Sequence, residues 1–307
     1  MKRNINMLII SLFLFQSCDK KEVVDLNLEI TVSNLEYKVN QDVEFLISGN
    51  PDQLAFYSGE DGHRYEHRNR TQAESKALNV EFYTNRRYGS DVQQPNSLRL
   101  LASQNFDNQY TASGVSEATW VDITTAFSLS PSQSDDVKYV SSGVVDLNSL
   151  KELGLNLDLN KQLYFAFKYN GSTGSTQPRW WLNQFTLTNI TPDGQIIPLT
   201  TLENAAWVSV GFNSSPVSWI FNTNGLRFAG GGAAVGSNQV WAVSKGIALN
   251  SISPDKPIAL KNMSTKIETY IYKFSKPGIY NVVFIGANTT AYGDSRSTKE
   301  FTLTINE

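Results

Sequence analysis

Cysteine, histidine and clustered positive charge are scarce in this chain. The single cysteine is Cys18, and the two histidines are His63 and His67. One cysteine cannot form an internal disulfide, and two histidines without a third ligand are a poor basis for a metal site. The chain carries 26 Lys+Arg against 29 Asp+Glu, for a formal net charge of −3. It therefore lacks the electrostatic footprint of a nucleic-acid-binding protein, and we predict neither a nucleic-acid partner nor a metal.

Patterns typical of catalytic sites are lacking too. A glycoside hydrolase needs two carboxylates on opposite sides of the bond that it cleaves. The acidic residues considered for such a pair are scattered over separate predicted elements: Glu44, Glu60, Asp61, Glu66 and Glu81. No Gly-x-Ser-x-Gly motif occurs, and the glycine run at residues 230–232 has no helix after it to form a phosphate-binding loop. We expect no catalytic residues and no enzymatic activity.

No apolar run is long enough to span a bilayer. The longest, residues 7–15, follows the basic residues Lys2 and Arg3 and ends shortly before the small residue Ser17 and then Cys18. This order is typical of a signal peptide cleaved before a cysteine that receives lipid. The sequence predicts a signal peptide at residues 1–17, lipidation of Cys18 and a tether at residues 18–23. Several acyl chains on one residue give firm anchoring, so the lipid is the only membrane contact that we expect.

Helical periodicity is nearly absent. Short alternating runs rich in Val, Ile, Thr, Tyr, Phe and Trp recur between Gly, Asn, Ser and Pro turns, which is the pattern of β-sandwiches and jelly rolls. A single helical turn is predicted at residues 147–155, capped by Asp146 or Ser149. The fold class predicted from these patterns is all-β.

Both ends of the chain contain three predicted strands. They cover residues 26–32, 44–48 and 54–58 at one end, and residues 266–274, 278–287 and 299–305 at the other. An immunoglobulin-type sandwich needs about 7 strands, so neither end buries a core alone. We predict one discontinuous domain from residues 24–63 and 264–307, with residues 64–263 inserted as a second domain.

Particular segments resemble known domains. The stretch ETYIYKFSKPGIYNVVFIGAN, closing on STKEFTLTI, resembles the last strands of a PKD-type immunoglobulin-like domain, and YKVNQDVEFLISGNPDQLAFYSGEDG resembles its first strands. In the insert, LYFAFKYNGS followed by RWWLNQFTLTN resembles the choice-of-anchor-J jelly roll, a carbohydrate-binding-like domain. Asn183 replaces the acidic residue of that pattern, so an inherited structural calcium is unsupported.

The whole arrangement, with FYSGEDGHRY at the junction, is similar to a lipoprotein family of unknown function from Bacteroidetes. The residues around Cys18 also resemble signals of outer-membrane lipoproteins in that group. The resemblance implies a cell-surface protein of a polysaccharide-utilisation system, lipid-anchored to the outer membrane. Its implied partners are polysaccharide or oligosaccharide and outer-membrane importer proteins, and it implies no cofactor.

The tryptophans indicate where a sugar would bind. All lie in the predicted insert, at Trp120, Trp180, Trp181, Trp207, Trp219 and Trp241. An indole face pairs with the C–H face of a pyranose while polar neighbours bind its hydroxyls. Adjacent strand residues face opposite sides, so if Trp180 packs inward then Trp181 points outward, beside Arg179 and Asn183. Trp219, after the polar loop NSSPVS, is a second candidate.

Two functions remain open from these residues. One is a non-catalytic surface lipoprotein that binds polysaccharide for an outer-membrane uptake system. The other is a structural or adhesive module that binds protein partners, because exposed aromatic residues also build protein interfaces.

Overall fold

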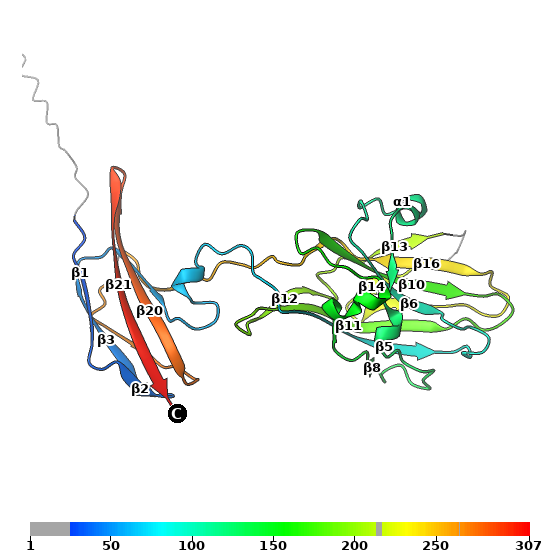
Figure 1. Ribbon diagram of the computed structural model, residues 1–307, viewed down its shortest axis with the longest axis horizontal. Helices are drawn as coiled ribbons and strands as arrows, with labels where there is room; N and C mark the ends of the chain where they lie inside the picture. Colours follow the sequence, from blue (N-terminus) through cyan, green and yellow to red (C-terminus); the bar gives the residue numbers. More distant parts are fainter. Residues whose placement is uncertain (1–24, 213–216, 264) are drawn as a thin grey trace, which may run out of the picture. The chain divides into compact units, whose positions relative to one another are not determined.

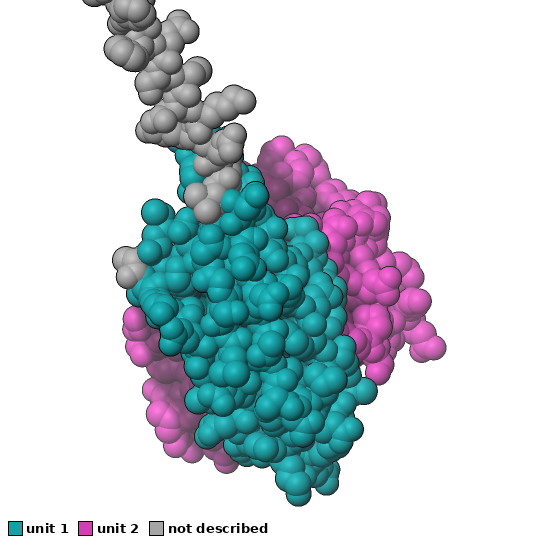
Figure 2. Space-filling model, turned by 90° about the vertical axis from the view of Figure 1, so that its left-hand side faces the viewer, with its two compact units in different colours: residues 1–69, 254–307 teal, residues 70–253 magenta. Residues whose placement is uncertain are grey.

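The computed structural model describes residues 25–212, 217–263 and 265–307 (Figure 1). The predicted signal peptide, Cys18 and the tether therefore lie outside the described residues. The chain divides into two compact units, coloured separately in Figure 2. We call residues up to 69 together with 254–307 the end unit, and residues 70–253 the inserted unit. In both, the regular secondary structure is almost entirely β-strand, so the predicted all-β class is confirmed.

The end unit consists of two sheets. The first has the spatial order β1 (Leu28–Val32), β3 (Val43–Gly49) and β19 (Thr269–Tyr272). The second has the order β18 (Ile258–Lys261), β4 (Gln53–Tyr57), β20 (Gly278–Thr290), β21 (Gly293–Asn306) and β2 (Glu36–Lys38). Only β2 and β21 pair in parallel. Figure 1 shows the long β20–β21 hairpin in orange and red, with the C-terminus at its end. Each strand predicted at the chain ends overlaps one of these strands.

Alternation along the strands places the core of the end unit between its sheets. In β3 the side chains of Val43, Phe45 and Ile47 are buried, and the residues between them are exposed. The rings of Phe45, Phe56 and Phe284 meet with centroid separations of 4.9–5.7 Å. Strands from both ends of the sequence therefore share one aromatic core.

The boundaries of the end unit differ from the predicted residues 63 and 264. Residues 64–69 and 254–263 belong to the end unit rather than to the insert. The reason is hydrogen bonding, because β18 pairs with β4 and the Arg64 amide donates to Asp255 Oδ2 at 2.9 Å.

The two segments that connect the units run antiparallel and are hydrogen-bonded to each other. On the end-unit side, the Lys256 amide donates to the Gly62 carbonyl at 3.0 Å. On the other side, the Ile252 amide donates to the Thr71 carbonyl at 3.2 Å. The insert therefore starts and finishes at neighbouring points of the chain.

The inserted unit also has two sheets. The six-stranded sheet comprises β13 (Val208–Gly211), β16 (Asn238–Val243), β10 (Gln162–Gly171), β6 (Leu98–Ser103) and β7 (Val121–Asp122), with β17 (Ile247–Ala248) on β10. The seven-stranded sheet comprises β14 (Ile220–Asn222), β15 (Gly225–Phe228), β11 (Arg179–Ile190), β5 (Ala77–Arg87) and β8 (Val140–Ser141), with β12 (Ile196–Thr201) on β11 and β9 (Val145–Asp146) on β5. The main core lies between the sheets, where Phe165 contacts Phe185 at 5.2 Å between ring centroids.

A second apolar cluster covers the outer face of the six-stranded sheet. Residues 104–120 include the short helix α1 (Ala112–Glu117), and its Val115 is fully buried in this cluster with Trp241 and Tyr164. Sequence analysis missed α1, whose local signal is Thr111, the N-cap that accepts from the Gly114 amide at 3.1 Å. The remaining helical turns are η1 (Tyr65–His67), η2 (Thr124–Ala126) and η3 (Leu147–Leu153). The last confirms the turn predicted at residues 147–155, with Asp146 as its N-cap.

Candidate functional site

The outer face of the seven-stranded sheet presents Trp181 at one end of β11. Trp180 is 3 % exposed in the core, and its indole N–H donates to Ser97 Oγ at 3.0 Å. Trp181 is half-buried on the opposite side of the strand. The predicted alternation of the two tryptophans is confirmed.

Two arginines and one asparagine, from three strands, lie around Trp181. Arg179 lies two residues earlier on β11, Arg227 lies directly opposite on β15, and Asn85 lies directly opposite on β5. The guanidinium carbons of Arg179 and Arg227 lie 4.6 and 5.6 Å from the Trp181 ring centroid. Both distances are within the range of cation–π attraction. The indole is therefore held between two cations on a half-buried surface.

A loop after β7 adds one carboxylate to this surface. Asp136 forms ion pairs with both Arg87 and Arg179. Hydrogen bonding from Arg87, together with the nearby positive charge, holds the pKa of Asp136 below its usual range. The loop is fastened by Asn85, whose amide nitrogen donates to the carbonyls of Asp135 and Lys138 at 2.9 and 2.8 Å.

Tyr88 completes the surface. Its side chain is 49 % exposed, and Arg87 and Arg179 lie 4.9 and 5.3 Å from its ring centroid. We refer to the residues that share these contacts as the Trp181 face: Arg87, Tyr88, Asp136, Arg179, Trp181 and Arg227. Arg227 and Asp136 come from segments far from β11 in sequence, so only strand pairing and loop closure reveal them.

Hydrogen bonding distinguishes Trp181 from most other tryptophans. Four of the six indole N–H groups donate to protein oxygens at 2.9–3.0 Å, those of Trp120, Trp180, Trp207 and Trp219. The Nε1 atoms of Trp181 and Trp241 are buried without an acceptor among the described residues. Trp241 is 7 % exposed in the apolar cluster beneath the α1 segment, whereas Trp181 is half-buried and belongs to none of the apolar clusters of the described chain.

Asn183 lies in a different environment from the one predicted. The pairing of β11 with β5 shifts between Leu182 and Gln184, so Asn183 occupies a bulge and both it and Gln184 are exposed. Asn183 lines a depression of about 590 Å³ together with Glu203, Phe221 and Asn222. Trp181 and Arg179 do not line this depression. The structure therefore groups Arg179 with Trp181 but not Asn183.

The depression has a feature that sequence analysis missed. Phe221 is 42 % exposed there, although its apolar run resembles a buried strand. Gly225 permits β15 to approach the bulge, because at φ 111° a side chain's Cβ would lie 2.1 Å from the Leu182 carbonyl oxygen.

The interpretation of Trp219 as a ligand contact is wrong. Its side chain is 5 % exposed, and its indole N–H donates to the Val240 carbonyl at 3.0 Å. Its ring lies 5.4 Å from that of Phe228 in the main core. The polar residues before Trp219 suggested an exposed position, but Trp219 itself is a core residue.

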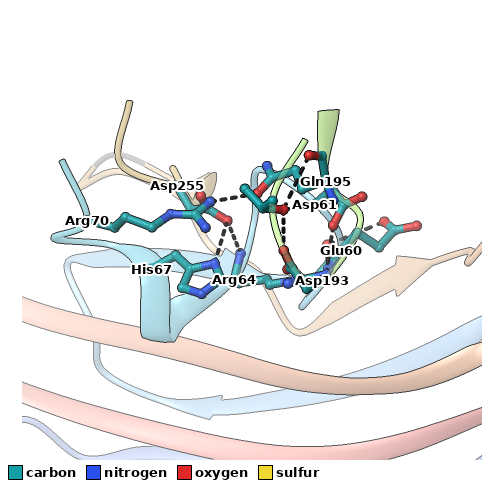
Figure 3. A network of polar contacts seen from close by, with 10 residues as sticks. Glu60, Asp61, Arg64, His67, Arg70, Asp193, Gln195 and Asp255 are labelled. Atoms are coloured by element: carbon teal, nitrogen blue, oxygen red, sulfur yellow. Dashed lines mark hydrogen bonds and ion pairs between the residues drawn. The ribbon is translucent and has the colours of Figure 1, made fainter. Parts of the chain in front are cut away.

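The two histidines contact the connecting segment instead of each other. His63 Nδ1 lies 2.6 Å from the Lys256 carbonyl oxygen, and His67 Nδ1 lies 4.0 Å from Asp255 Oδ2. Figure 3 shows Asp255 beside His67 and Arg64. Within residues 25–212, 217–263 and 265–307, no group of three His, Cys, Asp or Glu side chains is arranged to hold a metal ion.

The geometry and the comparisons together place the protein in a family. It is an all-β protein of two sheet-on-sheet units, and the described part contains no helix long and apolar enough to cross a membrane. Residues 17–207 match a domain of unknown function, DUF5017, and the chain belongs to this family. The match covers the first strands of the end unit and the inserted unit up to Trp207. Comparison with curated proteins finds no match.

Proposed function

We propose that this chain is a non-catalytic polysaccharide-binding lipoprotein whose ligand surface is the Trp181 face. Lipid on Cys18 holds it at the outer membrane, exposed at the cell surface beside importer proteins of a glycan uptake system. The observation that carries the proposal is the outward-facing indole of Trp181 between two guanidinium groups. Five of the six tryptophans of this unit pack into its apolar clusters, which leaves Trp181 as the exception.

The surface has the chemistry that a sugar requires. An indole offers an apolar area to the C–H face of a pyranose. Arg179 and Arg227 supply N–H donors for hydroxyl oxygens, and Asp136 supplies acceptors for hydroxyl hydrogens. Tyr88 adds a second exposed ring beside Arg179. Arg179, Trp181 and Arg227 lie on paired strands of a sheet, which fixes the backbone positions of these three residues.

The carboxylate on this face favours binding over hydrolysis. A glycosidase needs a general acid whose pKa is raised so that it keeps a proton for the leaving group. The pKa of Asp136 is shifted the opposite way by Arg87 and Arg179. Asp136 therefore suits hydrogen bonding and charge pairing rather than proton donation.

Affinity electrophoresis and calorimetry with plant, host and microbial polysaccharides test the proposal. The protein used is the chain from residue 18 onward carrying Cys18→Ala. Loss of a stacking aromatic removes about 1–3 kcal/mol of binding free energy, so Trp181→Ala weakens binding roughly ten-fold or more. Its melting temperature stays close to that of the wild type.

Two matched variants control for surface effects. Tyr292→Ala removes a ring that is 65 % exposed in the end unit, and it leaves binding unchanged. Phe221→Ala removes the ring of the neighbouring depression, and it reports whether that depression rather than Trp181 holds the sugar. Failure of the wild type to retain any polysaccharide, or full retention by Trp181→Ala, overturns the proposal.

The anchor is tested separately in cells. Cys18→Ala is expected to move the protein from the membrane fraction to the soluble fraction without unfolding it. Mass spectrometry of the wild-type N-terminal peptide provides the second readout. An unlipidated Cys18 in wild-type protein contradicts the anchor.

A further inference from the structure

We infer that the Trp181 face selects an anionic glycan, whose sugar carboxylate or sulfate group is held by Arg227 and Arg179. This inference rests on the proposed function and narrows its ligand class. It depends on the charges of the face, on the position of the guanidiniums over the ring, and on the pairing of Arg227.

Positive charge exceeds negative charge on this face. Arg87, Arg179 and Arg227 contribute three guanidiniums, while Asp136 alone forms ion pairs with two of them. Asp135 also acts electrostatically on Arg87, so two carboxylates stand against the three guanidiniums. The face therefore keeps an excess of positive charge, although the whole chain has a net charge of −3. Such a local excess attracts anions.

Arg227 is the least engaged of these cations. Six other arginines of the described chain form ion pairs with aspartate: Arg64, Arg86, Arg87, Arg99, Arg179 and Arg296. The Arg227 side chain forms no ion pair or hydrogen bond with any described residue, whereas Arg87 and Arg179, whose Nε atoms are likewise buried without an acceptor, are both paired with Asp136. Arginines that are partly buried are usually paired. A ligand anion is the partner that Arg227 lacks.

The cations over the ring distinguish between neutral and anionic sugars. Both guanidiniums already lie within 6 Å of the Trp181 ring centroid, so a sugar that stacks there competes with a cation–π contact. A neutral sugar offers the displaced guanidinium only hydroxyl oxygens. A carboxylate or sulfate offers it charge-assisted, two-pronged hydrogen bonds, which are stronger. The arrangement therefore favours a sugar that carries an anionic group next to its apolar face.

The experiment compares anionic and neutral polysaccharides on the chain from residue 18 onward with Cys18→Ala. Polygalacturonate and its methyl ester form one pair, and chondroitin sulfate and its desulfated form the other. In at least one pair, the protein is expected to bind the anionic polymer at least ten-fold more tightly than the neutral polymer. It is also expected to weaken as salt rises from 50 to 500 mM. The pair that discriminates identifies carboxylate or sulfate as the recognised group.

Arginine variants locate the effect. Arg227→Gln is expected to weaken binding of the anionic polymer at least ten-fold. Arg227→Lys is expected to weaken it less, because lysine keeps the positive charge but cannot form the two parallel hydrogen bonds of a guanidinium. Arg99→Gln is the matched control, since Arg99 is 42 % exposed on the six-stranded sheet and paired with Asp122. Equal loss in Arg99→Gln indicates non-specific attraction to a charged polymer and overturns the inference.

The outcomes separate this inference from the proposed function. Equal binding of the neutral and anionic members, with Arg227→Gln unaffected and Trp181→Ala defective, overturns the anionic ligand and leaves the glycan-binding proposal intact. Absence of binding to every polymer overturns both. Melting temperatures of Arg227→Gln and Arg227→Lys within 2 °C of wild type establish that lost binding is not unfolding.

Discussion

Each of the two outer faces of the inserted unit carries a tryptophan with a cation over its ring, but only one of the two tryptophans is enclosed in an apolar cluster. On the six-stranded sheet, Trp241 has Lys168 at 5.1 Å from its ring centroid, and residues 104–120 cover it. On the seven-stranded sheet, Trp181 has Arg179 and Arg227 over its ring and stays half-exposed. Neither indole N–H has an acceptor among the described residues. The two faces thus differ in how far a neighbouring segment buries the tryptophan, because residues 104–120 enclose Trp241 in an apolar cluster and the loop with Asp136 leaves Trp181 half-buried.

The largest expected effect concerns the covered tryptophan. Trp241→Ala removes a buried ring and is expected to lower the free energy of unfolding by about 3–5 kcal/mol. Trp181→Ala is expected to change it by only about 0.5 kcal/mol, because Trp181 is partly exposed and lies outside the apolar clusters of the unit. Urea denaturation of both variants measures the difference. Equal losses would mean that the two faces are both structural, which would break the comparison.

The covering segment itself comes next. Val115 in α1 is fully buried against Trp241 and its neighbours. Val115→Ala is expected to lower the free energy of unfolding by about 2 kcal/mol, from lost apolar burial and the cavity left behind. It is also expected to increase the quenching of Trp120 and Trp241 fluorescence by acrylamide. Unchanged quenching would show that α1 does not seal this face.

A smaller effect concerns Lys168. Burial lowers its pKa, with further lowering by Arg99. A lysine whose folded pKa lies below its unfolded value reduces stability at neutral pH, and that loss is recovered as pH rises through the folded pKa toward 10.5. Lys168→Met is therefore expected to remove this pH dependence. The measurement is the unfolding midpoint of both proteins between pH 7 and 10.5, and parallel curves would contradict the expectation.

The smallest stability effect is expected for Asp136→Asn. Exposed ion pairs contribute about 0–1 kcal/mol, so unfolding changes little. Binding of an anionic glycan is expected to tighten, because the one carboxylate between Arg87 and Arg179 becomes neutral. Calorimetry with the polymer that the wild type binds provides the value. Weaker binding would mean that the hydrogen bonds accepted by the Asp136 carboxylate contribute more to affinity than its negative charge costs.

The features that could be predicted from the sequence are those set by local residue patterns. Strands at both chain ends, the turn at η3 and the inward and outward directions of Trp180 and Trp181 all follow from alternation and capping. The features that could not be predicted are those set by strand pairing between distant segments. The bulge at Asn183 breaks the alternation that would have placed it beside Trp181, and the pairing of β15 with β11 brings Arg227 to the indole.

Trp219 illustrates a second limit. A tryptophan after a polar loop is equally consistent with an exposed rim or with the first core residue of a strand. Its contacts with Val240 and Phe228 come from elements that follow it in the chain. Neighbouring residues alone could not distinguish these outcomes.

The paired connecting segments have a consequence for resistance to proteolysis. The chain passes from the end unit into the inserted unit and back again, so two covalent connections join the units. Hydrogen bonds at Gly62–Lys256 and Thr71–Ile252 hold these connections together. A protease that cuts either connection once leaves the inserted unit attached through the other. The chain therefore tolerates a single nick at its junction without shedding the unit that carries the Trp181 face.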